Sequence, residues 1–170
     1  MATSDQLAPE SFVITRVFKA PRQKVWDAWT KPEQLARWFG PKGTTTTVKT
    51  HALRPGGVLH SCLTSPNGGT MWGKFVYREV AEPSRLVWVH SFSDEHGNVT
   101  RAPFFDGKWP LELLTVVTFE DDPAGTSLTL TWTPLNATEI ERQTFAGNMA
   151  SMNQGWGGSF EVLDSFLGGM

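Results

Sequence analysis

The C-terminal stretch, residues 136–167, constrains the fold of this chain more than any other segment. Its apolar side chains recur every three or four residues, which is the spacing of one helical face, at Phe145, Met149, Met152, Trp156, Phe160, Leu163 and Leu167. Asn136, with Glu139 three residues later, predicts a capping box, so the helix is expected to begin near Ala137. This is the longest helix that the sequence predicts.

Glycines interrupt this helical pattern at Gly147, Gly155, Gly157 and Gly158. Each costs about 1 kcal/mol relative to alanine inside a helix, so they need a reason to be there. One interpretation is close backbone packing or a bend near Gly147 and Asn148. The other is that the glycines, together with the flexible methionines, leave room for a ligand.

The middle of the chain has the alternating, β-branched pattern of strands separated by turns. In the last predicted strand Leu128, Leu130 and Trp132 alternate with threonines, which is typical of an antiparallel sheet with one covered face. The C-terminal helix is the natural cover for that face. The predicted strands are residues 11–20, 44–52, 58–64, 70–80, 85–92, 111–121 and 126–133.

Two short helices are predicted between the first and second strands. The first begins at Pro21, and the second begins at Pro32 and ends at Gly40 and Pro41. Arg37 is the only basic residue of the second helix, which argues against a DNA-reading helix pair. Residues 93–110 form a long irregular connection rich in aromatic side chains, as lids and binding loops often do.

Composition narrows the function classes. The chain has 8 Trp and 11 Phe but a single Tyr, which favours a thick core or a cavity for an apolar guest. The net charge of −2 and the lack of a basic run disfavour nucleic-acid binding. There is no signal peptide and no apolar stretch of the roughly 18 residues that a membrane span needs, so we expect a cytoplasmic protein. With 170 residues, we expect a disordered leader over residues 1–10 and one domain over residues 11–170.

Several short motifs together carry a family resemblance. They are A-P-x-x-x-V-W-x-A-W-T at residues 20–30, P-E-x-L-x-x-W-F-G-P at 32–41, R-P-G-G at 54–57, Gly73 with Glu79, P-x-x-L at 83–86, Gly125-Thr126 leading into L-T-L at 128–130, and Gly155-Trp156. In this order the chain resembles the START-like or Bet v 1-like (SRPBCC) superfamily. More narrowly, it is similar to the AHSA-type family, related to the activator of heat-shock-protein-90 ATPase.

The resemblance implies an α+β helix-grip fold. In such a fold a curved antiparallel sheet, here of about seven strands, wraps around a long C-terminal helix, two short helices lie between strands 1 and 2, and a hydrophobic cavity lies between sheet and helix. Relatives of this type bind lipids, hormones or polyketides, a few are cyclases, and others are co-chaperones. No catalytic residue set accompanies the narrower family, so none is transferred to this chain.

We expect the cavity wall to include Trp38, Phe39, His60, Trp88, His90, Trp132, Met149, Met152 and Trp156, although each of these side chains could equally be plain core. His90 is the candidate for chemistry, because a buried imidazole costs free energy unless it is hydrogen-bonded. It could fix one end of a ligand, act as a general base, or be a satisfied core histidine.

Metal and nucleotide sites are not expected. His60 and Cys62 point the same way on one strand, but the other histidines do not have the spacing of zinc ligands. No glycine-rich phosphate loop is present either, so we expect no cofactor.

The sequence therefore favours a binder of a small hydrophobic ligand that is lipid-, polyketide- or aromatic-like, over an enzyme. The first alternative is a cyclase or hydrolase that uses His90. The second is a co-chaperone-like interaction module with a chaperone partner, which the lack of a further domain or charged tail weakens. Homodimerisation through an edge strand or the outer face of the sheet is left open.

Overall fold

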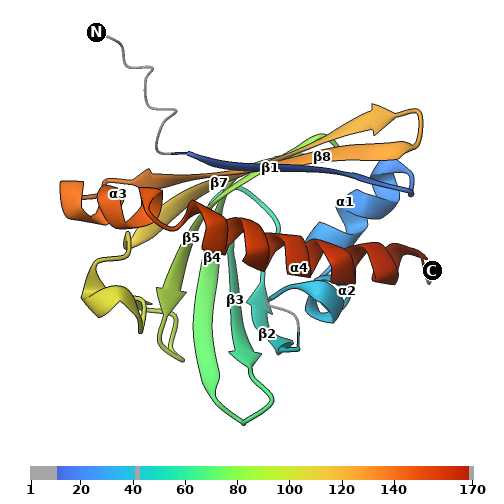
Figure 1. The fold of residues 1–170 in the computed structure, drawn as a ribbon. Coiled ribbons are helices and arrows are strands. Elements are labelled where there is room, and N and C mark those ends of the chain that lie inside the picture. Colours follow the sequence, from blue (N-terminus) through green and yellow to red (C-terminus); the bar gives the residue numbers. More distant parts are fainter. Residues whose placement is uncertain (1–10, 41–42, 169–170) are drawn as a thin grey trace, which may run out of the picture.

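The computed structural model describes residues 11–40 and 43–168. Residues 1–10, expected to be a disordered leader, and Pro41, at the expected end of the second short helix, lie outside the described residues. Figure 1 shows a broad sheet with one long helix, α4, lying across it. Among the described residues, no helix combines the length and the apolar character needed to cross a bilayer.

Within the described ranges the strands form one open antiparallel sheet of eight strands in the order β1-β8-β7-β5-β4-β3-β2, with β6 paired to β5. Seven of these strands match the predicted ones, and β6 is a two-residue strand inside the long connection. The strands are β1 (Phe12–Phe18), β2 (Thr45–His51), β3 (Val58–Thr64), β4 (Thr70–Ala81), β5 (Arg85–Ser93), β6 (Val99–Thr100), β7 (Glu112–Asp122) and β8 (Gly125–Leu135).

Two short helices follow β1, as the sequence predicts, and the chain ends in two further helices. The helices are α1 (Arg22–Thr30), α2 (Pro32–Trp38), α3 (Glu139–Ala146) and α4 (Met149–Gly168), and a 3-10 turn, η2 (Phe105–Gly107), lies in the long connection. The predicted C-terminal helix is thus divided in two at Gly147 and Asn148. This is the position at which the glycine pattern predicts a bend.

The predicted cap of this helical region was wrong by two residues. Thr138 is the N-cap of α3: its side chain accepts a hydrogen bond from the backbone N–H of Glu141, whose carboxylate accepts one from the Thr138 backbone N–H. Asn136 has a φ of 54°, in the left-handed region, whereas an N-cap residue has an extended backbone. Asn136 therefore belongs to the turn after β8, and the capping box begins two residues later.

An aromatic core closes one end of the space between the sheet and α4. At its centre the fully buried ring of Trp29 contacts the rings of Trp38, Trp88, Phe119, Trp156 and Phe160 at centroid distances of 4.7 to 6.4 Å. Phe160, Leu163 and Leu167 bring the C-terminal half of α4 into this core. Figure 1 shows α1 and α2 beside this half of α4.

Candidate ligand-binding cavity

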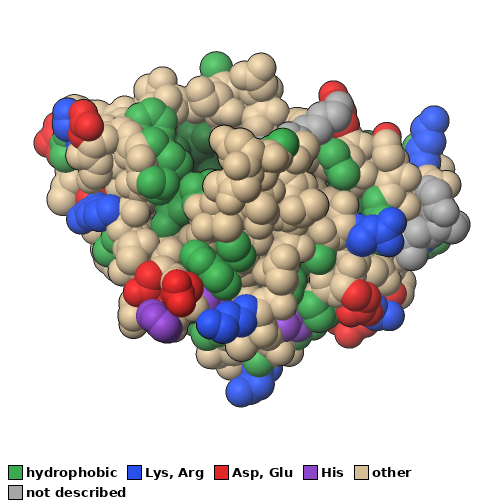
Figure 2. Space-filling view, turned by 90° about the horizontal axis from the view of Figure 1, so that it is seen from below, with side chains coloured by type: hydrophobic (Ala, Val, Ile, Leu, Met, Phe, Trp, Pro, Cys, Tyr) green, Lys and Arg blue, Asp and Glu red, His purple; other side chains and the backbone are tan. Residues whose placement is uncertain are grey.

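A cavity of about 460 Å³ lies between the sheet and the N-terminal half of α4. This volume falls within the range of about 300–1,000 Å³ that is typical of small-molecule sites. Figure 2 shows a hollow bordered by hydrophobic side chains. The wall consists of Leu63, Met71, His90, Phe92, Leu113 and Trp132 from the sheet, Asn148, Ser151, Met152, Gly155, Trp156 and Ser159 from α4 and the residue before it, and Phe39, Gly40, Phe104, Phe105 and Trp109 from connections.

Part of the expected wall lies at this cavity. The structure places Phe39, His90, Trp132, Met152 and Trp156 there. Trp132 and Trp156 meet edge to face with their ring centroids 5.4 Å apart, which joins β8 to α4. These side chains come from distant parts of the sequence, and the sheet register and the position of α4 bring them together.

Trp38, Trp88 and Met149 do not line the cavity. Trp38 packs on Trp29 and donates its indole N–H to the carbonyl oxygen of Ala28 at 2.8 Å, so it belongs to the closed end. Trp88 lies on the inner face of β5 but stacks on Phe75 at 4.4 Å and is 1% exposed. Met149, at the start of α4, packs against the core. The fold places these three side chains beside the cavity rather than on its wall.

His60 is also outside the cavity, because it lies on the opposite face of the sheet. Leu63, on the same strand but an odd number of residues away, faces the cavity, so His60 and Cys62 point outward. The His60 ring packs over Trp72 at a centroid distance of 4.8 Å. Its Nε2 donates to the carbonyl oxygen of Asp94 at 3.0 Å.

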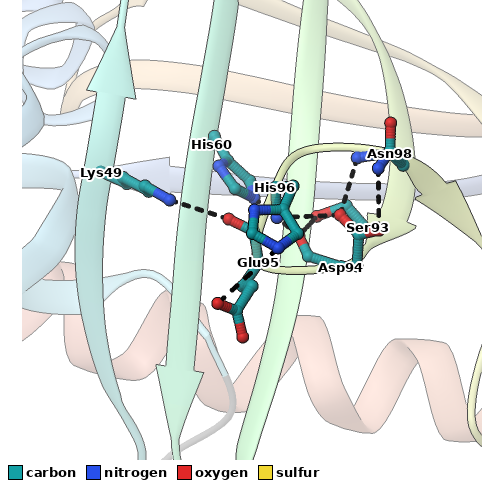
Figure 3. Close-up of polar contacts among 7 residues, drawn as sticks. All are labelled: Lys49, His60, Ser93, Asp94, Glu95, His96 and Asn98. Carbon is teal, nitrogen blue, oxygen red and sulfur yellow. Dashed lines mark hydrogen bonds and ion pairs between the residues drawn. The ribbon is translucent and has the colours of Figure 1, made fainter.

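Two lysines hold the same outer loop, which connects β5 to β6, and Figure 3 shows one of them, Lys49. Lys49 donates to the carbonyl oxygen of Glu95 at 2.8 Å, and Lys74 donates to that of Gly97 at 2.9 Å. The cluster of polar residues in Figure 3 therefore attaches a loop to the sheet. Among the described residues, no three His, Cys, Asp or Glu side chains are placed to hold a metal ion.

Asp94 organises this loop from within. Its carboxylate accepts hydrogen bonds from the side chain and the backbone N–H of Asn98 and from the backbone N–H of His96 (Figure 3). The side chain of Asn98 contributes most to keeping the pKa of Asp94 below its ordinary value, followed by the Asn98 backbone N–H. Asp94 is thus an acceptor fixed by its own loop.

Aromatic side chains of the long connection form part of the cavity wall. Phe104 and Phe105 are each 39% exposed, whereas Trp109 is buried, stacked on Phe105 at 5.3 Å and packed on Phe145 of α3 at 5.5 Å. Phe105 and Asp106 both have left-handed backbones, with φ of 59° and 50°. Such a conformation costs about 1–2 kcal/mol for a residue other than glycine. This strained turn holds large apolar rings at the cavity while leaving them partly exposed.

An ion pair ties this connection to α3. Arg101 Nη1 donates to Oε2 of Glu141, whose side chain is only 8% exposed, and also to the carbonyl oxygen of Trp109 at 3.4 Å. Burial raises the pKa of Glu141, but hydrogen bonds from the Thr138 backbone N–H and from Arg101 outweigh it, so the pKa lies below its ordinary value. Glu141 therefore stays ionised while it both caps α3 and positions the aromatic connection.

Among the described residues that line the cavity, His90 is the only titratable one. Its ring lies among Phe75, Phe92 and Trp132, at centroid distances of 5.4, 6.4 and 5.4 Å. Burial lowers the pKa of His90 from 6.5 to about 4, and no charged neighbour contributes to the shift. The imidazole is therefore neutral at physiological pH, with one ring nitrogen as donor and the other as acceptor.

The sequence analysis predicted that the long connection, residues 93–110, is a lid or binding loop. It did not predict that Phe104, Phe105 and Trp109 of this connection line the cavity. It also missed the inward-facing residues on the neighbouring strands, Leu63, Met71 and Leu113. Strand alternation could have identified Phe92, which shares a face with His90. The pairing of β3 with β4, which places Leu63 opposite Met71, could not be read from either strand alone.

The wrapped antiparallel sheet, the long helix and the cavity between them define the helix-grip class of α+β proteins. The family model described as "Activator of Hsp90 ATPase homolog 1-like protein" matches residues 19–168, and the chain belongs to this family. The expected family and fold class are thus confirmed. No curated protein matches the chain.

Several solved structures match the fold of this chain over nearly its whole length. Protein Ms6760 from Mycobacterium smegmatis is 29% identical with a TM-score of 0.75, and the match covers 95% of this chain and 92% of that one. A protein from Arthrobacter aurescens is 27% identical with a TM-score of 0.79, covering 96% and 89%. The AHSA1 protein from Silicibacter pomeroyi, at 17% identity and a TM-score of 0.69, covers 93% and 97% and shares the fold.

Proposed function

We propose that this protein binds a small hydrophobic ligand in the cavity between the sheet and α4. The observation that carries the proposal is the cavity wall itself. It combines aromatic rings and methionines with few polar groups, and no charged side chain of the described residues lines it. A ligand that enters gains apolar contact on several sides, at about 25 cal/mol for each Å² of apolar surface removed from water.

Two glycines of α4 offer a matched pair of variants for a test. Gly155 lines the cavity, whereas Gly157, two residues further along the helix, does not. A Cβ atom at either position would meet no other heavy atom within 4 Å. A side chain at Gly155 can therefore block the cavity, and the same side chain at Gly157 controls for the loss of glycine from the helix.

The test is a fluorescence titration with N-phenyl-1-naphthylamine, an uncharged apolar probe. The unmodified protein should bind it saturably at one site. Gly155→Trp should weaken binding at least tenfold, and Gly157→Trp should stay within about twofold of the unmodified protein. The proposal fails if the unmodified protein shows no saturable binding, or if both variants bind the probe equally well.

The enzymatic alternative has less support. A histidine base in a hydrolase is usually oriented by a carboxylate, and no Asp or Glu of the described residues lines the cavity beside His90. The co-chaperone alternative follows from the family description. It would need an exposed apolar surface outside the cavity. Val13 and Val17 on the outward face of β1 are exposed, but their sheet neighbours Thr131 and Ser127 are polar.

A further inference from the structure

A second, smaller space of about 40 Å³ adjoins the main cavity. The two spaces share Phe39, Leu63, Met71, His90 and Phe92 as wall residues. A space of this size holds about one water molecule or one small functional group. We call it the recess. His90 lies where the two spaces meet.

Gly73 of β4 leaves room for the recess. It pairs with Ser61 on one side and with Phe92 on the other, so any side chain at this position would stand between β3 and β5. A Cβ atom on Gly73 would contact only the carbonyl oxygen of Ser91, at 3.4 Å. The space that a larger residue would fill is therefore left to a guest.

The recess has polar groups where the main cavity wall is mostly apolar. The hydroxyl of Ser61 and the imidazole of His90 both belong to residues that line it. Across residues 11–40 and 43–168, neither side chain has a hydrogen-bond partner. Ser61 is 5% exposed and His90 is partly buried, so a guest that fills the recess removes both groups from water. Such a guest is favoured if it supplies hydrogen bonds in place of that water.

We propose that the ligand is an uncharged aromatic alcohol, whose ring system fills the main cavity and whose hydroxyl enters the recess to hydrogen-bond with His90 and Ser61. This inference rests on the proposed function and adds the chemical class of the ligand. A hydroxyl both donates and accepts, as do a neutral imidazole and a serine. A charged group is disfavoured because no described residue on either wall provides an opposite charge.

Three probes of similar shape test this inference by calorimetric titration at pH 7: naphthalene, 2-naphthol and 2-naphthoate. The unmodified protein should bind 2-naphthol about tenfold more tightly than naphthalene, and 2-naphthoate most weakly. His90→Leu and Ser61→Ala should each reduce the ratio of the 2-naphthol affinity to the naphthalene affinity severalfold. Ser127→Ala is the control, because Ser127 of β8 lines neither the main cavity nor the recess.

Equal affinity for naphthalene and 2-naphthol in the unmodified protein would overturn this inference and leave the proposed function standing. So would tightest binding of 2-naphthoate, or a preference for 2-naphthol that Ser61→Ala and His90→Leu both retain. If His90→Leu does not fold, Ser61→Ala alone decides. Failure of the unmodified protein to bind any of the three probes would overturn both proposals.

Discussion

Arg101 and Glu141, forty residues apart in sequence, form an ion pair that fastens the aromatic connection to the first turn of α3. The same carboxylate accepts a hydrogen bond from the backbone N–H of Thr138 and so completes the helix cap. One side chain therefore sets both where α3 begins and where Phe104, Phe105 and Trp109 lie at the cavity. The position of these rings depends on a contact outside the cavity.

Removing the Arg101 side chain should loosen this connection. We expect Arg101→Ala to increase hydrogen exchange of the backbone amides in residues 102–109 severalfold and to lower the free energy of unfolding by about 1 kcal/mol, since Arg101 is half exposed. Hydrogen-exchange mass spectrometry checks both the site and the size of the effect. Arg85→Ala, which breaks the exposed Arg85–Glu79 pair, is the control and should leave these amides unchanged.

The N-cap assignment predicts a contrast between two variants. Thr138→Ala should lower the free energy of unfolding by about 1 kcal/mol, because it removes the acceptor for the backbone N–H of Glu141. Asn136→Gly should be neutral or stabilising, because Asn136 has a positive φ that glycine adopts without strain. Urea unfolding of both variants measures the difference. If Asn136→Gly lowered the free energy of unfolding more than Thr138→Ala, Asn136 and not Thr138 would be the N-cap residue.

The capping error shows what the sequence alone could provide. Asn136 with Glu139 and Thr138 with Glu141 both match a capping box, and only the turn after β8 decides between them, because it puts Asn136 in the left-handed region. The strands were predicted well because alternation and turn residues are local signals. The 66–69 turn, for example, joins β3 and β4 where the sequence predicts it.

The cavity wall was harder to predict than the strands. Whether a side chain lines the cavity depends on which face of the sheet it points to and also on whether other side chains cover it. Trp88 and His90 share one face of β5, and alternation predicts this correctly. Trp88 is nevertheless covered by Trp29 and Phe75, whereas His90 reaches the open half of the space. Trp88 is covered because α1 places Trp29 against it. The sequence of β5 alone contains no information on the position of Trp29.

His90 should make stability depend on pH. Its pKa of about 4 in the folded protein is below the value of 6.5 expected when unfolded, so the unfolded chain binds more protons between these pH values. Stability should therefore fall as pH drops from about 6.5 to about 4. At about 1.4 kcal/mol per pH unit, the loss over about 2.5 units is at most about 3.5 kcal/mol.

Urea unfolding at pH 7 and pH 4.5 measures this effect in the unmodified protein and in His90→Leu. Burial also lowers the pKa of His51, against a weaker opposing influence of Glu33, so His51 contributes in the same direction. Only the difference between the two proteins therefore reports on His90. Identical pH dependence in both would contradict a desolvated imidazole.

The central claim is that an apolar ligand occupies the space under the N-terminal half of α4, and methionine methyl groups can report this directly. Met71 and Met152 line the cavity, whereas Met149 does not. In protein with ¹³C-labelled methionine methyl groups, saturating N-phenyl-1-naphthylamine should shift the Met71 and Met152 signals and give nuclear Overhauser contacts from the probe to both methyl groups. The Met149 signal should change little. Contacts absent from Met71 and Met152 at saturation would place the ligand elsewhere and contradict the account.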